Sequence, residues 1–97
     1  MAFMYLLECG DGTFYAGSTR NLVARLQQHR RGQGAQYTRS RLPVRLVYFE
    51  SHDDIGRAFG REKAVQGWTR SKKRRLIEVG PGHRVTEDDG TRLDFLT

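Results

Sequence analysis

Five side chains in the first two thirds of the chain have the types that hydrolysis of a phosphodiester requires. Tyr5 and Tyr15 carry phenols that can orient a water molecule or a phosphate oxygen. Arg25 offers a planar guanidinium that can bind a phosphate through two N–H groups. His29 titrates near neutral pH and can take a proton. Glu62 is a hard oxygen ligand, suited to Mg²⁺ or Mn²⁺ that also keeps water and substrate phosphate.

The two tyrosines lie in a predicted β-hairpin. Residues 3–9 and 13–17 are strand-like, and Gly10-Asp11-Gly12 between them has the composition of a hairpin turn. Side chains alternate along a strand, so antiparallel pairing predicts that Tyr5 and Tyr15 face the same site.

A helix follows, capped by Ser18 or Thr19 and running to about Arg31. Arg25 and His29 are one turn apart on it, beside the apolar stripe. We therefore expect both side chains at the edge of the buried interface, facing the sheet.

Glu62 lies in a second predicted helix. Residues 35–43 read as a loop and residues 44–50 as a third strand. Ser51 to Asp54 fits a capping box that opens a helix to about Gly67. Glu62 falls near the centre of its predicted inward face, where a carboxylate is costly unless it is paired, hydrated or metal-bound. That face is formed by Ile55, Ala58, Phe59 and Val65.

A third helix is expected from a cap at Thr69 or Ser71 to about Val79. Residues 80–82, Gly-Pro-Gly, break any helix. We predict a domain over residues 1–80 and an acidic tail over residues 81–97, which carries Glu87, Asp88, Asp89 and Asp94.

The charge pattern favours a polyanionic partner. The 97 residues include 17 lysines and arginines against 11 acids, for a formal net charge of +6. No acidic residue occurs from Ala16 to Phe49. We predict DNA as the partner, with RNA as the alternative. The residues expected to hold the phosphate backbone are Arg20, Arg30, Arg31, Tyr37, Arg39, Arg41, Arg70, Lys72 and Lys73.

Other classes of protein fit the sequence poorly. The single cysteine, Cys9, excludes an intrachain disulfide and a cysteine-based zinc site. No apolar stretch approaches the length of a membrane span, and no signal peptide begins the chain. A cytoplasmic location is therefore expected. The sequence does not indicate the oligomeric state.

The ordered set of residues resembles the GIY-YIG nuclease superfamily, and above all its small single-domain bacterial members. Residues 3–5, Phe-Met-Tyr, stand where the family has Gly-Ile-Tyr, and residues 15–17, Tyr-Ala-Gly, where it has Tyr-Ile-Gly. Arg25, His29 and Glu62 match the family's helix arginine, His/Tyr position and metal-binding glutamate. The resemblance covers roughly residues 3–78. Phe3 departs from the glycine, and Lys72 to Arg75 lies where some larger members have an asparagine.

The resemblance implies an α+β fold of order ββαβαα, with a three-stranded antiparallel sheet flanked by three helices. It implies a Mg²⁺- or Mn²⁺-dependent endonuclease that cuts DNA. Nothing in the sequence looks like a base-reading helix, so we expect preference for a DNA structure rather than a sequence. Either Tyr5 or His29 would be the general base. Two alternatives remain: a non-catalytic nucleic-acid-binding module on the same fold, and an interaction protein with an acidic partner. Glu62 could also form a purely structural ion pair with Arg25.

Overall fold

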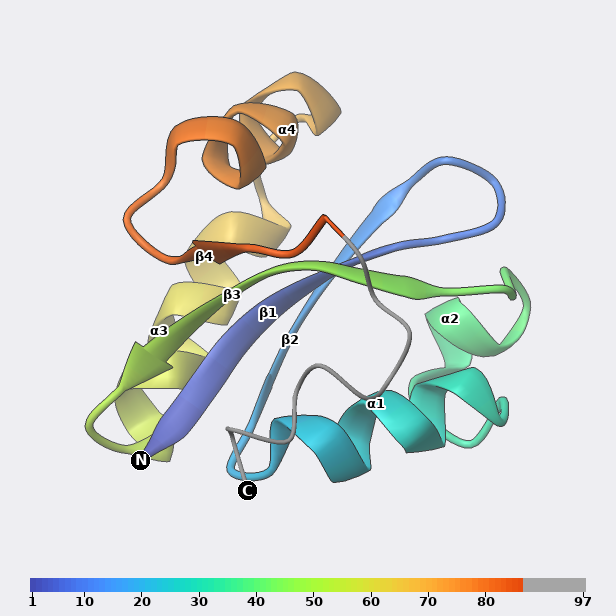
Figure 1. Ribbon diagram of the computed structural model, residues 1–97, viewed down its shortest axis with the longest axis horizontal. Helices are drawn as coiled ribbons and strands as arrows, with labels where there is room; N and C mark the ends of the chain where they lie inside the picture. The colour runs from blue at the N-terminus through green and yellow to red at the C-terminus, as the bar shows by residue number, and fades with distance from the viewer. Residues whose placement is uncertain (87–97) are drawn as a thin grey trace.

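The computed structural model describes residues 1–86 and shows an antiparallel sheet with helices on both faces (Figure 1). The α+β class is confirmed. The acidic residues of the predicted tail, Glu87, Asp88, Asp89 and Asp94, lie outside the described residues. None of the helices within residues 1–86 is long and apolar enough to cross a membrane.

The predicted hairpin is present. β1 (Ala2–Glu8) pairs antiparallel with β2 (Phe14–Thr19), and the register sets Tyr5 opposite Gly17 and Leu7 opposite Tyr15. Gly12 takes a positive φ of 84° in the turn, which suits a residue without Cβ. Tyr5 and Tyr15 are thus both on the same face of the sheet, as the alternation predicts.

The sheet has four strands, so the prediction of three was wrong. β3 (Arg45–His52) pairs with β1, and a two-residue strand β4 (His83–Arg84) pairs with β3. The order is β2-β1-β3-β4, which leaves β2 at an edge. β4 falls in the predicted tail, where two residues are too few to give a strand pattern. It is held by its partner strand rather than by its own composition.

Each face of the sheet has its own apolar core. α1 (Leu22–Arg30) covers one face, and α3 (Ile55–Gln66) with α4 (Arg70–Val79) covers the other (Figure 1). Residues that alternate along β1 separate the two cores. The α1 core contains Phe3, Tyr5, Leu7, Leu22, Leu26, Leu46 and Phe49, and the α3–α4 core contains Met4, Leu6, Phe14, Ala16, Val47, Tyr48, Val65, Leu76 and Ile77.

The cap of α1 differs from the prediction. Asn21 caps the helix by accepting a 3.1 Å hydrogen bond from the backbone N–H of Ala24. Ser18 and Thr19 belong to β2, which continues past the predicted end at Gly17. Gly32, with a φ of 76°, follows the helix as expected.

The remaining helices are close to expectation, with three differences. The 35–43 loop contains a fourth helix of one turn, α2 (Gln36–Arg39). α3 is capped by Asp54 alone, because β3 extends through Ser51 and His52. Phe59 is not on the inward face of α3, since 49% of it is exposed. Thr69 caps α4 as predicted, and that helix ends at Val79.

Candidate active site

Tyr5 and His29 form a buried hydrogen-bonded pair on the α1 face. Tyr5 Oη lies 2.8 Å from His29 Nε2. His29 is completely buried and Tyr5 is 2% exposed. Gly17 makes this arrangement possible, because a Cβ at Gly17 would overlap the Tyr5 hydroxyl and ring. Tyr5 therefore lies directly over the edge strand.

Tyr15 completes an aromatic cluster around the imidazole. Its ring meets the edge of the His29 ring with centroids 5.5 Å apart, and Tyr5 does the same at 5.7 Å. Tyr15 also stacks on Tyr37 of α2 at 5.9 Å. These contacts fix the plane of the imidazole from two sides.

The second nitrogen of the His29 ring is also bonded. His29 Nδ1 lies 2.9 Å from Thr38 Oγ1, and Thr38 is itself completely buried in α2. Gly34 packs against the same ring, since a Cβ there would overlap Nδ1. α2 and the residues before it thus enclose the His29 ring on the side of Nδ1.

Burial and Arg25 set the protonation of this pair. Burial and, to a smaller extent, the positive charge of Arg25 together lower the pKa of His29 to about 4. Burial also raises the pKa of Tyr5, an effect that Arg25 partly opposes. Both groups are therefore neutral near pH 7. Arg25, which is half-buried, influences both of them and also donates to Gln28 at 2.9 Å.

Glu62 approaches the same edge from the opposite face. Its carboxylate accepts hydrogen bonds from Ser18 Oγ of β2 at 2.7 Å and from Gln66 Nε2 at 2.8 Å. Burial raises the pKa of Tyr15, and the negative charge of Glu62 raises it further; Glu62 also contributes to the raised pKa of Tyr5. Because β2 is an edge strand, groups from both faces meet beside it.

The carboxylate of Glu62 is not in an ion pair with Arg25. Within residues 1–86 its cationic neighbour is Lys63, whose Nζ lies 3.9 Å away. The residue is only 8% exposed, and both of its hydrogen-bond donors are neutral. The structural ion pair weighed from the sequence is therefore absent, and among residues 1–86 no arginine pairs with this carboxylate.

The donor set of Glu62 fits a hard divalent cation with few protein ligands. Within residues 1–86 no group of three or more His, Cys, Asp or Glu residues is arranged to hold a metal. A site completed by water and phosphate needs one or two carboxylates, which Glu62 can supply. The residues present therefore suit Mg²⁺ or Mn²⁺ and do not suit a structural zinc ion.

A shallow groove of about 310 Å³ runs beside the edge strand. Tyr15 and Tyr37 line it from one face of the sheet, and Gln66 and Lys73 line it from the other. Lys73 Nζ contacts the backbone oxygen of Phe14 at 3.4 Å. The groove therefore extends from Tyr15 and Tyr37 to Gln66, which donates a hydrogen bond to Glu62.

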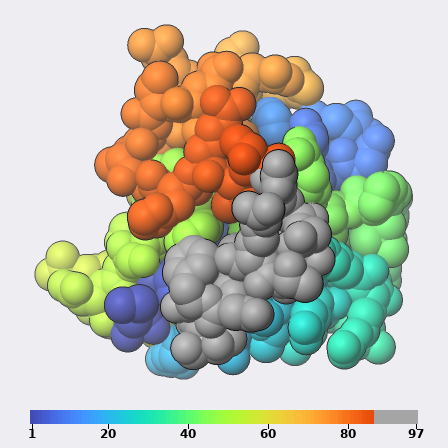
Figure 2. All heavy atoms as spheres, in the orientation of Figure 1, coloured from blue at the N-terminus to red at the C-terminus, as the bar shows by residue number. Residues whose placement is uncertain are grey.

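The predicted nucleic-acid-binding residues come from two parts of the chain, residues 20–41 around α1 and α2, and α4. In the space-filling view, α4 and α1 lie at opposite ends of the face shown (Figure 2). Arg20, Arg31, Arg39, Arg70 and Lys72 are exposed, whereas Arg30 and Lys73 are half-buried. Arg41 is occupied within the protein: it pairs with Asp11 at 3.0 Å and lies 3.8 Å from the Tyr37 ring centroid.

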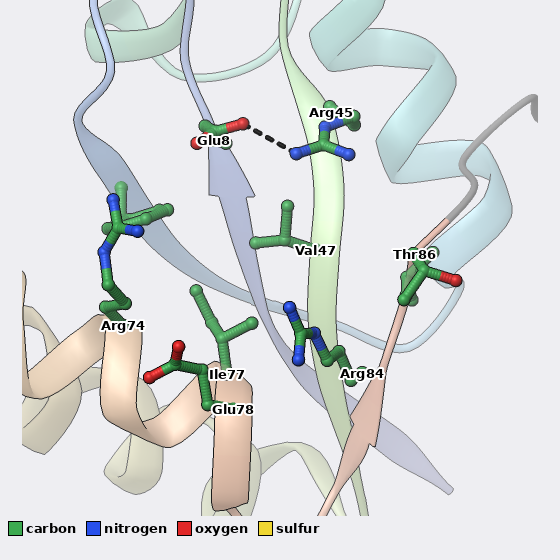
Figure 3. A pocket seen from close by; sticks show the side chains of 10 residues that line it. Glu8, Arg45, Val47, Arg74, Ile77, Glu78, Arg84 and Thr86 are labelled. Carbon is green, nitrogen blue, oxygen red and sulfur yellow. Dashed lines mark hydrogen bonds and ion pairs between the residues drawn. The ribbon is translucent and has the colours of Figure 1, made fainter.

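A second hollow lies on the α3–α4 face, away from the tyrosines. It has a volume of about 220 Å³ and is lined by arginines from β3, α4 and β4 that alternate with acidic residues (Figure 3). Arg45 pairs there with Glu8 at 2.8 Å. None of the five candidate catalytic residues lines it. Its charges are largely balanced, so it is a poorer candidate for phosphate chemistry.

The sequence did not point to four residues that support the site. Ser18 and Gln66 hold Glu62, while Gly34 and Thr38 hold His29. Helical spacing alone could have indicated Gln66, because it lies one turn after Glu62 in the same helix. Ser18 is separated from Glu62 by 44 residues, and no local pattern reveals such a contact.

Comparison with known proteins agrees with this geometry. A family model described as the GIY-YIG catalytic domain matches residues 1–75. A UPF0213 protein of Haloquadratum walsbyi is 42% identical over 78 residues, covering 80% of this chain and 88% of that protein. A UPF0213 protein of Staphylococcus aureus is 45% identical over 76 residues, covering 78% and 93%.

A solved structure is also similar. The solution structure of the UPF0213 protein BH0048 from Bacillus halodurans superposes with a TM-score of 0.51 at 38% identity, covering 80% of this chain and 84% of that one. Fold, motif order and the match over residues 1–75 agree. This chain therefore belongs to the GIY-YIG family, a family of nucleases.

Proposed function

We propose that this protein is a metal-dependent endonuclease that hydrolyses phosphodiester bonds of DNA. The observation that carries the proposal is the 2.8 Å contact between Tyr5 Oη and His29 Nε2. It joins two separate candidates for the base into one unit, beside tyrosines on which both Glu62 and Arg25 act electrostatically. A module that only binds nucleic acid has no need for a buried imidazole bonded to a phenol.

The pair supports a proton relay in which two protons each move by one position. A water molecule beside Tyr5 gives its proton to Tyr5 Oη while the phenol proton moves to His29 Nε2. The water oxygen forms a bond to phosphorus, and the bond from phosphorus to the 3′ oxygen breaks. The 3′ oxygen takes a proton from solvent, so the products are a 5′-phosphate and a 3′-hydroxyl. The transfer requires that Nε2 of the resting enzyme carry no proton.

Arg25 makes the proton affinity of His29 depend on whether substrate is bound. In the free protein its charge adds to burial in lowering the pKa of His29. A phosphodiester bound to Arg25 would offset that charge and raise the proton affinity of the imidazole. The base would thus strengthen as the anionic substrate arrives.

Glu62 would hold Mg²⁺ or Mn²⁺, which supplies Lewis-acid stabilisation of the phosphate and leaving-oxygen charge. Ser18 and Gln66 orient the carboxylate for this task. Lys73, the exposed arginines that flank α1 and the exposed cations of α4 would position the strand along β2 without reading its sequence. We therefore expect preference for a DNA structure rather than a sequence.

A cleavage assay with labelled duplex, branched and single-stranded DNA tests the proposal. Wild type and Glu62→Gln are purified identically and assayed with Mn²⁺, Mg²⁺ or EDTA. We expect metal-dependent cleavage by the wild type and a loss on the order of a hundredfold or more in the variant. Equal activity in both would indicate a contaminant. Salt-sensitive binding without cleavage on every substrate would instead support the binding module, which the basic surface also favours.

A further inference from the structure

The hydrogen bonds behind His29 determine which ring nitrogen carries its proton. Thr38 Oγ1 donates to the backbone oxygen of Ala35 at 3.0 Å. A hydroxyl has one hydrogen, and a carbonyl oxygen can only accept. Towards His29 Nδ1, 2.9 Å away, Thr38 must therefore act as the acceptor. Nδ1 is then the protonated nitrogen.

The opposite tautomer would leave mismatched groups in a buried place. With a proton on Nε2, Nδ1 would need the Thr38 hydrogen, and the hydroxyl oxygen would face the Ala35 oxygen without a proton between them. Both His29 and Thr38 are completely buried, so neither side chain can take a water molecule as an alternative partner. The Ala35 oxygen also accepts from the backbone N–H of Arg39 at 3.1 Å. Two oxygen atoms held 3.0 Å apart with no hydrogen between them repel each other, so the Nε2–H tautomer is disfavoured.

We propose that Thr38 is a positioning residue that holds His29 in the Nδ1–H tautomer, so that Nε2 is free to take the proton of Tyr5. Gly34 leaves the space in which the ring must lie for this contact, because a Cβ there would overlap Nδ1. The role rests on the proposed nuclease function, although the tautomer itself does not.

The same contacts suit the protonated state of the ring. When Nε2 receives the proton of Tyr5, the imidazolium has two N–H groups. Nδ1–H keeps Thr38 Oγ1 as its acceptor, and Nε2–H donates to the oxygen of Tyr5, which has taken the proton of the water. Thr38 is uncharged, so it fixes the tautomer without adding a permanent negative charge beside the base.

Nitrogen NMR of the imidazole rings is the direct test. Protein labelled with ¹⁵N is studied near pH 7, and the His29 signals are assigned by their loss in His29→Gln, because His52 and His83 remain. We expect a protonated Nδ1 and an unprotonated Nε2 in the wild type. A wild-type His29 with its proton on Nε2 would overturn the proposal, whatever the variants do.

Thr38→Val and Thr38→Ser then test the role of the hydroxyl. Valine has nearly the same shape but no hydroxyl, so we expect His29 to populate the Nε2–H tautomer. Serine should restore the wild-type spectrum. An unchanged tautomer in a folded Thr38→Val would overturn the proposal. If that variant does not fold, Thr38→Ser and the wild-type spectrum still decide the tautomer.

Enzyme kinetics distinguishes a positioning role of Thr38 from a general loss of native structure in the variant. In Thr38→Val we expect kcat to fall on the order of 10- to 100-fold, as when hydrogen-bond partners of functional histidines are removed, with KM little changed. Thr38→Ser should keep most of the activity. A loss confined to KM would contradict the role. If the wild type cleaves no substrate, the proposed function fails while the NMR result still stands.

Discussion

Ser18 donates a 2.7 Å hydrogen bond to Oε1 of Glu62, linking the edge strand to α3 across 44 residues of sequence. Ser18 lies on the opposite face of β2 from Tyr15, so the strand contributes to the candidate site with both faces. The carboxylate is therefore oriented by the same strand that places the tyrosine cluster.

Replacing Ser18 by alanine tests this orientation. Loss of the hydroxyl leaves one carboxylate oxygen without its donor, and we expect unfolding free energy to fall by about 1–3 kcal/mol. The concentration of Mn²⁺ needed for half-maximal cleavage should rise roughly tenfold or more. Ser51→Ala, an exposed serine of β3, is the control. An unchanged Mn²⁺ requirement in Ser18→Ala would show that Glu62 needs no such support.

Gly17→Ala should disable the site through Tyr5. The new Cβ would overlap the phenol, so the ring must move, at a cost of about 1–3 kcal/mol in stability. Cleavage should fall much further than stability. Gly60→Ala is the matched control, because nothing lies within 4 Å of a Cβ there, on the exposed side of α3. It should raise helix stability by about 0.5–1 kcal/mol and leave cleavage unchanged. Full activity in Gly17→Ala would contradict the placement of Tyr5.

The low pKa of His29, about 4, predicts a specific loss of stability in acid. An unfolded histidine titrates near ~6.5, so between that pH and about 4 the unfolded chain binds more protons than the native one. This residue therefore makes stability fall as pH decreases through that window. Urea unfolding from pH 7 to 4 should show a steeper fall for wild type than for His29→Gln. Parallel curves would mean that His29 titrates normally in the folded protein.

Lys73→Met should weaken DNA binding by a few fold and reduce the slope of log affinity against log salt by about 1. Lys73 lines the groove with Tyr15 and Tyr37, where a phosphate would displace its contact with Phe14. Arg57→Met removes the same charge from a site where Arg57 faces Asp54 at 3.7 Å, and it serves as the control. Equal effects of the two changes would point to net charge alone. Binding can be measured in EDTA with Glu62→Gln, so cleavage does not interfere.

Local pattern was enough to predict the hairpin, the shared face of Tyr5 and Tyr15, and most of the helices. It misplaced the cap of α1 because Ser18 is a common capping residue, and nothing local says that β2 continues through it. It placed Phe59 inside because the residue is apolar and beside Ala58, yet helix position leaves it half exposed. It missed β4, since that strand depends on its partner β3.

The contacts that complete the candidate site could not be predicted from the local sequence pattern, for a different reason. Thr38 meets His29 only because a one-turn helix folds back under α1, and Ser18 meets Glu62 only because α3 crosses the edge strand. Such contacts depend on how elements pack, not on the period of the sequence. Family resemblance supplied the five candidate residues but not their supports.

The edge position of β2 also has a consequence for how a substrate would enter. A site enclosed by walls or a ring admits a long polymer only by threading a free end. A site along the rim of a sheet is open at both ends of the strand, so an internal linkage can approach sideways. On the proposed function, a closed circular DNA without any ends should therefore be as good a target as a linear one.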